Sequence, residues 1–130
     1  MLSELFDQYI SAVMGKSAEA LSSLFAEQGR LVLPFRRSRD VIAGRENIYQ
    51  HYASGFSVAP LRFTSIDEVR FHYTKNADVA VVEYRLHGQT LPEKKKFVLS
   101  YVNVIKCNNG EIMELVDYED VLNREAIFSS

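Results

Sequence analysis

Hydrophobic residues in the first part of the chain recur at intervals of three and four positions, which is the spacing of one face of an α-helix. The pattern predicts a first helix over residues 2–14, and a short second helix that Ser17 caps and that continues past Phe25. A short strand is expected over residues 30–35. A polar, arginine-rich loop should follow it, and then a third helix over residues 44–55.

After Pro60 the pattern changes to an alternation of hydrophobic and polar residues, which is typical of strands with one buried face. It predicts four long strands, joined by turns rich in glycine, asparagine or proline, over residues 62–73, 78–88, 95–106 and 111–120. Helices followed by an antiparallel meander indicate an α+β domain with its helices on one face of a curved sheet. Such a sheet forms a cone, and the open end of a cone is a natural cavity for a small molecule.

Composition places the chain among soluble globular proteins. Its 130 residues suffice for a single domain, residues 1–130, with one core. Hydrophobic residues make up 47% of the sequence and charged residues 25%, and the net charge is -2. This balance argues against a nucleic-acid or anionic-membrane partner, which would require a surplus of basic residues. The basic clusters at residues 36–39 and 94–96 are interpreted as solvated surface.

The sequence also bears on the cellular compartment of the protein and on whether it holds a metal or cofactor. The single cysteine, Cys107, cannot form an intramolecular disulfide, and no hydrophobic run approaches the ~20 residues of a membrane span. The N-terminus carries acids where a signal peptide would be basic, so the chain is expected to be cytoplasmic. No trio of His, Asp or Glu has metal-ligand spacing, and there is no glycine-rich phosphate loop. Neither a metal nor a cofactor is therefore expected.

Two polar residues near the end of the chain are candidates for chemistry. Asn103 occupies the middle of the more aromatic face of its strand, where a buried amide without partners would cost about 1–3 kcal/mol. It is either satisfied inside the sheet or aimed into a cavity. Asp117, in the stretch VDYEDVLN, either marks where the last strand leaves the core or provides acid/base chemistry at the mouth of a pocket.

The hairpin at residues 107–111 decides whether these two residues share a face. A two-residue Asn-Gly turn would pair Val102 with Asp117 and put Asn103 and Asp117 on opposite faces. A three-residue loop would pair Tyr101 with Asp117 and put them on the same face, because a shift of one residue moves every side chain to the other face. The Asn-Gly dipeptide favours the first option locally, and composition leaves both open.

The stretches YISAVMGKSAEALSSLFAEQGRLVLPF, GRENIYQHY and GEIMELVDYED, in this order, resemble the nuclear transport factor 2-like superfamily. Within it, the chain is most similar to the small SnoaL-like and ketosteroid isomerase-like proteins, over residues 5–122. The resemblance implies the cone-shaped, cystatin-like fold: three N-terminal helices packed in a strongly curved antiparallel sheet around an apolar pocket. It also implies a dimer face on the sheet. A homodimer is expected, because Val98, Val102 and Val104 make the outer face too apolar for water.

Site residues follow from the same resemblance. The family's isomerases stabilise a dienolate with a tyrosine of the first helix and an acid on a late strand, which match Tyr9 and Asn103 here. An asparagine can still donate a hydrogen bond. The proton-abstracting base of these isomerases falls at Leu33, which cannot accept a proton, so steroid isomerisation by that mechanism is not expected. Tyr52 matches a tyrosine that supports the first-helix tyrosine by hydrogen bonding.

The ending DY-D is similar to that of SnoaL-like polyketide cyclases and limonene-type epoxide hydrolases. Their last-strand aspartate, a general acid or base, matches Asp117. The hydrolases also need an arginine and an aspartate two residues apart, and the nearest counterpart here, residues 83–85, has the reverse order. Family members with this hairpin length keep the acid facing the pocket, which favours the three-residue loop. The residues expected to line the pocket are Leu33, Phe35, Tyr52, Phe56, Tyr101 and Leu115.

Two functions fit these features. The first is an isomerase, cyclase or hydrolase that transfers a proton on a small hydrophobic, oxygen-bearing molecule. Asp117 would be its acid or base, and Tyr9 and Asn103 would donate to a developing oxyanion. The second is a non-catalytic ligand-binding or dimeric interaction module of the same fold. Leu33 favours the second function and Asp117 the first, and the fold alone hosts both.

Overall fold

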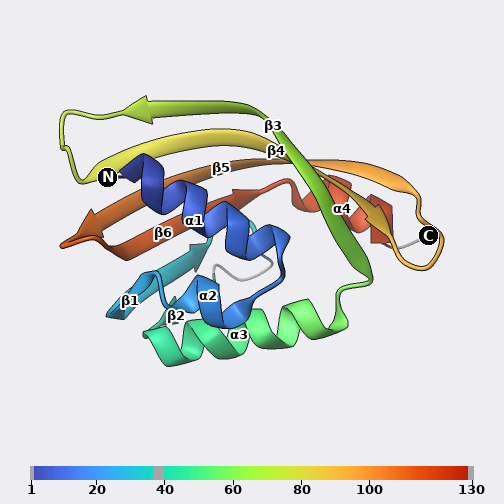
Figure 1. Ribbon diagram of the computed structural model, residues 1–130, viewed down its shortest axis with the longest axis horizontal. Helices are drawn as coiled ribbons and strands as arrows, with labels where there is room; N and C mark the ends of the chain where they lie inside the picture. The colour runs from blue at the N-terminus through green and yellow to red at the C-terminus, as the bar shows by residue number, and fades with distance from the viewer. Residues whose placement is uncertain (1, 37–39, 129–130) are drawn as a thin grey trace.

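The protein is described by a computed structural model that covers residues 2–36 and 40–128 (Figure 1). Four helices and six strands are present within these residues. In chain order they are α1 (Leu2–Met14), α2 (Ala18–Ser22), β1 (Phe25–Leu33), β2 (Asp40–Ala43), α3 (Arg45–Val58), β3 (Leu61–Tyr73), β4 (Val79–Thr90), β5 (Lys96–Asn108), β6 (Glu111–Glu119) and α4 (Val121–Phe128).

The strands form one sheet in the order β2-β1-β6-β5-β4-β3. All neighbouring pairs are antiparallel except β1 and β6, which run parallel. The long strands bend around α1, which lies across their concave side, and α3 lies below α1 and α2 in this view (Figure 1). The predicted α+β cone is therefore confirmed, with a mixed sheet and an additional C-terminal helix, α4.

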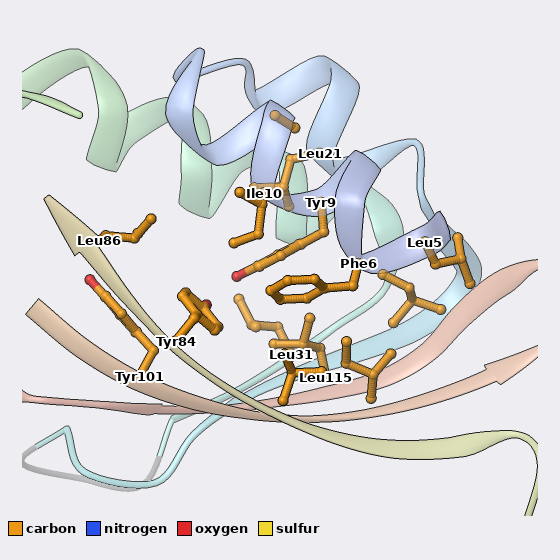
Figure 2. Packing of buried hydrophobic residues seen from close by; sticks show 14 of the residues in the cluster. Leu5, Phe6, Tyr9, Ile10, Leu21, Leu31, Tyr84, Leu86, Tyr101 and Leu115 are labelled. Carbon is orange, nitrogen blue, oxygen red and sulfur yellow. The ribbon is translucent and has the colours of Figure 1, made fainter. Parts of the chain in front are cut away.

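The core forms between α1 and the concave side of the sheet. The hydrophobic face of α1 contributes Leu5, Phe6 and Ile10, all buried, as the spacing of three and four predicted. They pack against strand residues such as Leu31 and Leu115, both 0% exposed (Figure 2). Burial of each such side chain contributes about 1.5–3 kcal/mol, so this contact holds the helix in the cone.

The extent of the second helix was predicted wrongly, and the strand β2 was missed as well as α4. Ser17 caps α2 as predicted, accepting a hydrogen bond from the Ala20 amide, but the helix ends at Ser22. Phe25 instead begins β1 and pairs with Ile112, because the sheet provides a fully buried site for its ring. The segment predicted as an arginine-rich loop contains the edge strand β2, whose alternating partial exposure gives no strong hydrophobic signal.

The two basic clusters differ in environment. Residues 94–96 are exposed, as the solvated interpretation required. In the first cluster, Arg37 and Arg39 lie outside the described residues. Arg36 is half-buried and lines a cavity, so the solvated interpretation is wrong for this residue.

Candidate functional site

The β5–β6 hairpin combines a two-residue turn with a bulge. Asn109 (φ 52) and Gly110 (φ 77) are both left-handed, as a type I′ turn requires. The register then shifts by one residue, because Cys107 pairs with Ile112 whereas Lys106 pairs with Glu114. Met113 is the extra residue of this bulge.

The bulge places Asp117 directly opposite Asn103 on the same face of the sheet. Neither predicted register is found, since Asp117 pairs with neither Val102 nor Tyr101. The turn has two residues, as the Asn-Gly dipeptide favoured. Asn103 and Asp117 nevertheless share a face, as the three-residue loop would have required, because the extra residue in β6 shifts the register by one.

A chain of hydrogen bonds holds the Asp117 carboxyl. Asn103 Nδ2 donates to Asp117 Oδ1 over 2.8 Å, and the Tyr84 hydroxyl donates to Asn103 Oδ1 over 2.6 Å. Asn103 is 0% exposed and does not line the cavity, so its amide supports Asp117 from behind. The sequence predicted that this amide donates to an oxyanion in the pocket, whereas in the structure it donates to Asp117. The alternation of β4 gives no sign of the Tyr84 hydroxyl contact.

Desolvation and, to a smaller extent, the negative charge of Glu119 raise the pKa of Asp117 from 3.8 to about 7 overall. The hydrogen bond from Asn103 and the charges of Arg36 and Arg124 oppose this shift. A group with a pKa near 7 is present in both protonation states at neutral pH, which suits a general acid or base.

Three tyrosine hydroxyls face this carboxyl from different elements: Tyr9 from α1, Tyr52 from α3 and Tyr84 from β4. Burial raises the pKa of each well above its usual value, and the charge of Asp117 raises each one further. They therefore remain protonated and able to donate. Within the described residues, the buried Tyr52 hydroxyl has a weak hydrogen-bond contact with the Tyr9 hydroxyl and no closer partner.

These groups border a cavity of about 170 Å³ at the open end of the cone. In Figure 2, Tyr9 points from α1 toward the strands that carry Tyr84 and Tyr101. The cavity wall is mostly apolar. Of the residues expected at the site, those that line this cavity are Tyr9, Leu33, Tyr52, Phe56, Tyr101 and Asp117; the apolar wall also includes Val13, Leu61, Phe63, Leu86 and Leu99.

Two residues expected at the pocket lie elsewhere. Phe35 is 56% exposed, because β1 ends at Leu33 and the chain then turns out of the alternation; its ring packs against Tyr118, 5.3 Å away, outside the cavity. Leu115 does face inward. It lies two residues before Asp117, where α1 fills the cone, and it is 0% exposed in the core (Figure 2).

Charged side chains gather at the mouth of the cavity. Arg124 Nη1, from α4, lies 2.9 Å from both carboxylate oxygens of Glu119, whose side chain is 10% exposed. Arg36 approaches the same carboxylate at 3.8 Å, and the Tyr101 hydroxyl donates to it over 3.4 Å. His51 also lines the mouth, and burial lowers its pKa. Sequence reasoning missed the two arginines, since one follows a strand and the other lies on a helix that no strong pattern marks.

The arginine and acid that an epoxide hydrolase would need do not meet in this cavity. Arg85 is on the outer face of the sheet, where it forms a two-pronged contact of 3.1 and 3.0 Å with Asp67. Glu83 is on the same outer face and contacts His72 over 2.6 Å. Within residues 2–36 and 40–128, no group of three His, Cys, Asp or Glu side chains is placed to hold a metal ion. In the same residues, no helix has the length and hydrophobicity needed to span a bilayer.

Known proteins with the same fold include candidate enzymes. A candidate isomerase from Bacillus subtilis has a TM-score of 0.86 at 19% identity, over 98% of this chain and 91% of that one. A candidate polyketide cyclase from Xanthomonas campestris pv. campestris has a TM-score of 0.76 at 16% identity, over 96% and 94%. TerC, solved with polyporic acid, has a TM-score of 0.74 at 16% identity, over 98% and 97%. At these identities the likeness shows a shared fold.

Family membership rests on the sequence itself. No curated protein matches the chain. The model of the SnoaL-like domain, however, matches residues 6–115, which is most of the sequence, and the cone agrees with the predicted nuclear transport factor 2-like fold. The chain therefore belongs to the SnoaL-like domain family.

Proposed function

We propose that this protein is an acid/base enzyme that isomerises or cyclises a small, hydrophobic, oxygen-bearing molecule, with Asp117 as the group that transfers the proton. One observation carries the proposal. Asp117 is an ionisable group in an apolar cavity, with a pKa of about 7 and a carboxyl oriented by Asn103. Solved relatives of the same fold that are candidate isomerases and cyclases support the reaction class by analogy.

The reaction would proceed by transfer of a proton within the cavity. The Asp117 carboxylate takes a proton from a carbon next to a carbonyl, and the electron pair moves onto the carbonyl oxygen. The Tyr9 and Tyr52 hydroxyls, both protonated, donate hydrogen bonds to that oxygen. In an isomerisation, the protonated Asp117 returns the proton to another carbon of the conjugated enolate, which moves a double bond. In a cyclisation, the enolate carbon attacks a second carbonyl carbon of the same molecule, the new carbon–carbon bond closes the ring, and Asp117 protonates the alkoxide that forms.

The size and walls of the cavity limit the substrate. A buried apolar cavity of about 150 Å³ holds a benzene-sized ligand. A cavity of about 170 Å³, with phenylalanine and leucine walls, is therefore suited to a single ring or a short branched chain. Leu33, where the steroid isomerases of the family have a base, is one of these apolar walls.

The experiment is a deuterium-exchange assay on a panel of small cyclic ketones in D₂O, followed by proton NMR. Asp117→Asn should reduce exchange about 10²–10⁴-fold, since it keeps the size of the side chain and removes the transferable proton. Asp67→Asn, on the outer face, is the matched control and should exchange like the wild type. If Asp117→Asn binds and exchanges the ketones as well as the wild type, Asp117 is not the acid or base, and the non-catalytic ligand-binding alternative stands.

We also propose that the outer face of the sheet forms a homodimer. Val81, Val104 and Val116 lie directly beside one another on β4, β5 and β6 and are each partly exposed, with Val98 and Val102 nearby. This continuous valine stripe on an open face is typical of a protein–protein contact. Sedimentation at micromolar concentration should show a dimer. Val104→Glu should produce monomers, and Val58→Glu, on α3, should not.

A further inference from the structure

The two arginines at the cavity mouth come from segments that follow two neighbouring parallel strands, β1 and β6. Arg36 follows β1, and Arg124 belongs to α4, far away in the sequence. Both line the same cavity as Asp117, and both approach the single carboxylate of Glu119. Each arginine side chain is 37% exposed, so neither is sealed in the core.

The two arginines differ in how they contact Glu119. Arg124 Nη1 contacts both oxygens of Glu119 at 2.9 Å, so this pair anchors α4 beside the mouth. Arg36 Nη2 lies 3.8 Å from one oxygen, which is longer than a hydrogen bond. Arg36 is therefore positioned at the cavity without being committed to this partner by a hydrogen bond, and its planar fork is available for a ligand.

The charges that line the cavity favour an anion. Arg36 and Arg124 carry two positive charges against one negative charge on Glu119. His51 faces the same space from α3, and burial and the Arg36 charge lower its pKa, which keeps it neutral at neutral pH. Asp40, on β2, acts electrostatically on His51 but does not line the cavity. The lining therefore carries one net positive charge when Asp117 is protonated.

We infer that Arg36 and Arg124 bind a planar oxyanion, a carboxylate or the anion of an acidic enol, at the mouth, while the apolar part of the same ligand fills the cavity. A guanidinium fork matches two coplanar oxygens, and such charge-assisted contacts are about twice as strong as neutral ones. The inference rests on the proposed function, because it names the class of substrate for that site. The ligand is then a small ring or short chain with one acidic oxygen-bearing end.

The state of Asp117 must influence this binding. An anion at the mouth is repelled by the Asp117 carboxylate and not by the neutral acid. The anion should therefore bind better below the pKa of Asp117, which is about 7, and more weakly above it. Asp117 is therefore the group beside the anion whose change of charge should control binding near neutral pH.

A matched pair of probes tests the inference. Benzoate and benzamide have nearly the same shape and differ in charge, and both suit a cavity of about 170 Å³. Their dissociation constants would be measured by NMR titration at pH 6.0 and 8.5, with the arginine side-chain NH signals as local reporters. Wild-type protein should bind benzoate about tenfold tighter than benzamide at pH 6.0, as expected for one charged hydrogen bond. The preference should shrink at pH 8.5 and persist there in Asp117→Asn.

Variants separate the arginines from general surface charge. Arg36→Gln should remove most of the benzoate preference and leave benzamide binding unchanged. Arg30→Gln, a surface arginine beside Glu114 that does not line the cavity, should keep it. Arg124→Gln leaves Glu119 without its closest partner, so it is paired with Glu119→Gln to keep the mouth neutral and folded.

The outcomes also separate this inference from the proposed function. Equal binding of benzoate and benzamide, or the same loss in Arg30→Gln as in Arg36→Gln, would overturn the anion site and leave the Asp117 chemistry standing. If neither probe perturbs the cavity signals at millimolar concentration, the cavity does not take a ring-sized ligand, and both proposals fail. Selective benzoate binding with unaltered ketone exchange in Asp117→Asn would support the anion site alone.

Discussion

Asn103 and Asp117 lie directly opposite each other on β5 and β6, and the amide of the first donates to the carboxyl of the second over 2.8 Å. Both side chains are held by neighbours on the inner face of the sheet, and Tyr84 completes the chain from β4. The acid therefore keeps one orientation before any ligand arrives. Preorganisation of this kind is what a proton-transfer site requires.

Removing the amide should make Asp117 a weaker acid. The hydrogen bond from Asn103 lowers the pKa of Asp117, so Asn103→Leu should raise that pKa above its present value of about 7. Carbon-13 NMR titration of the Asp117 carboxyl measures this directly. Tyr84→Phe is the control: it keeps the Asn103 donor and should leave a smaller shift. A pKa that falls in Asn103→Leu would contradict the assigned hydrogen bond.

Asp117 should make folding stability depend on pH in an unusual direction. Its pKa is about 7 in the folded protein and about 3.8 when unfolded, so the folded state binds the proton more tightly. The stabilising contribution of the protonated form is complete below pH 3.8 and disappears as the pH rises through 7. Between pH 5.5 and 8.5, wild-type protein should lose about 2 kcal/mol relative to Asp117→Asn, at about 1.36 kcal/mol per pKa unit.

Urea unfolding of both proteins at the two pH values measures this difference. Asp67→Asn is the control, because contact with Arg85 lowers the pKa of Asp67 and keeps that carboxylate ionised throughout the range. Because Asp67 also contacts His87 over 2.9 Å, the stability of this control relative to wild type should change between pH 5.5 and 8.5 by much less than that of Asp117→Asn. A constant difference for Asp117→Asn as well would show that Asp117 has an ordinary pKa.

The two cavity tyrosines should separate stability from activity. The Tyr52 hydroxyl interacts with that of Tyr9 and has no other hydrogen-bond partner within the described residues, so Tyr52→Phe should change the free energy of unfolding by less than about 1 kcal/mol. The same change should slow ketone exchange, because a donor to the oxyanion is lost. Tyr9→Phe should slow exchange on the order of 10²–10³-fold. A larger loss of stability in Tyr52→Phe would mean that its hydroxyl has a further partner in solution.

Leu33 offers a gain-of-function test. Leu33 is 4% exposed and lies in the cavity wall. Because β1 runs parallel to β6 and Val32 pairs with Val116, the residues that follow them, Leu33 and Asp117, are neighbours on adjacent strands. Leu33→Asp should add a base and produce measurable isomerisation of cyclohex-3-enone to its conjugated isomer, followed by ultraviolet absorbance. Leu33→Asn controls for polarity. No gain in a folded variant that binds the ketone would show that the tyrosines do not stabilise the enolate.

The sequence revealed the elements whose patterns are strong. The four long strands β3 to β6 follow the alternation of period two, and α1 follows the spacing of three and four. The short edge strand β2 and the exposed helix α4 bury little, so no pattern marks them. The bulge at Met113 escaped prediction because an extra residue in a strand is recognised only from its partner strand.

The roles of the acidic residues at the end of β6 could not be predicted from the sequence either. Asp117 and Glu119 reach the cavity, while Asp120 accepts a hydrogen bond from the Asn123 amide and caps α4. Nothing in the letters DYED separates these roles, because they depend on a register and on a helix that follow from tertiary packing. The resemblance supplied Asp117, and it could not supply Arg36 or Arg124, which are not part of its motifs.

The bulge at Met113 determines which face of the sheet carries the Asp117 carboxyl. If the same residues paired without the bulge, Asp117 would lie opposite Val102 on the outer face, and Leu115 and Val116 would exchange faces with it. The cavity would then lack its acid and the outer face would lack one of its valines. A single extra residue in β6 therefore sets both the polarity of the cavity and the apolar character of the outer face.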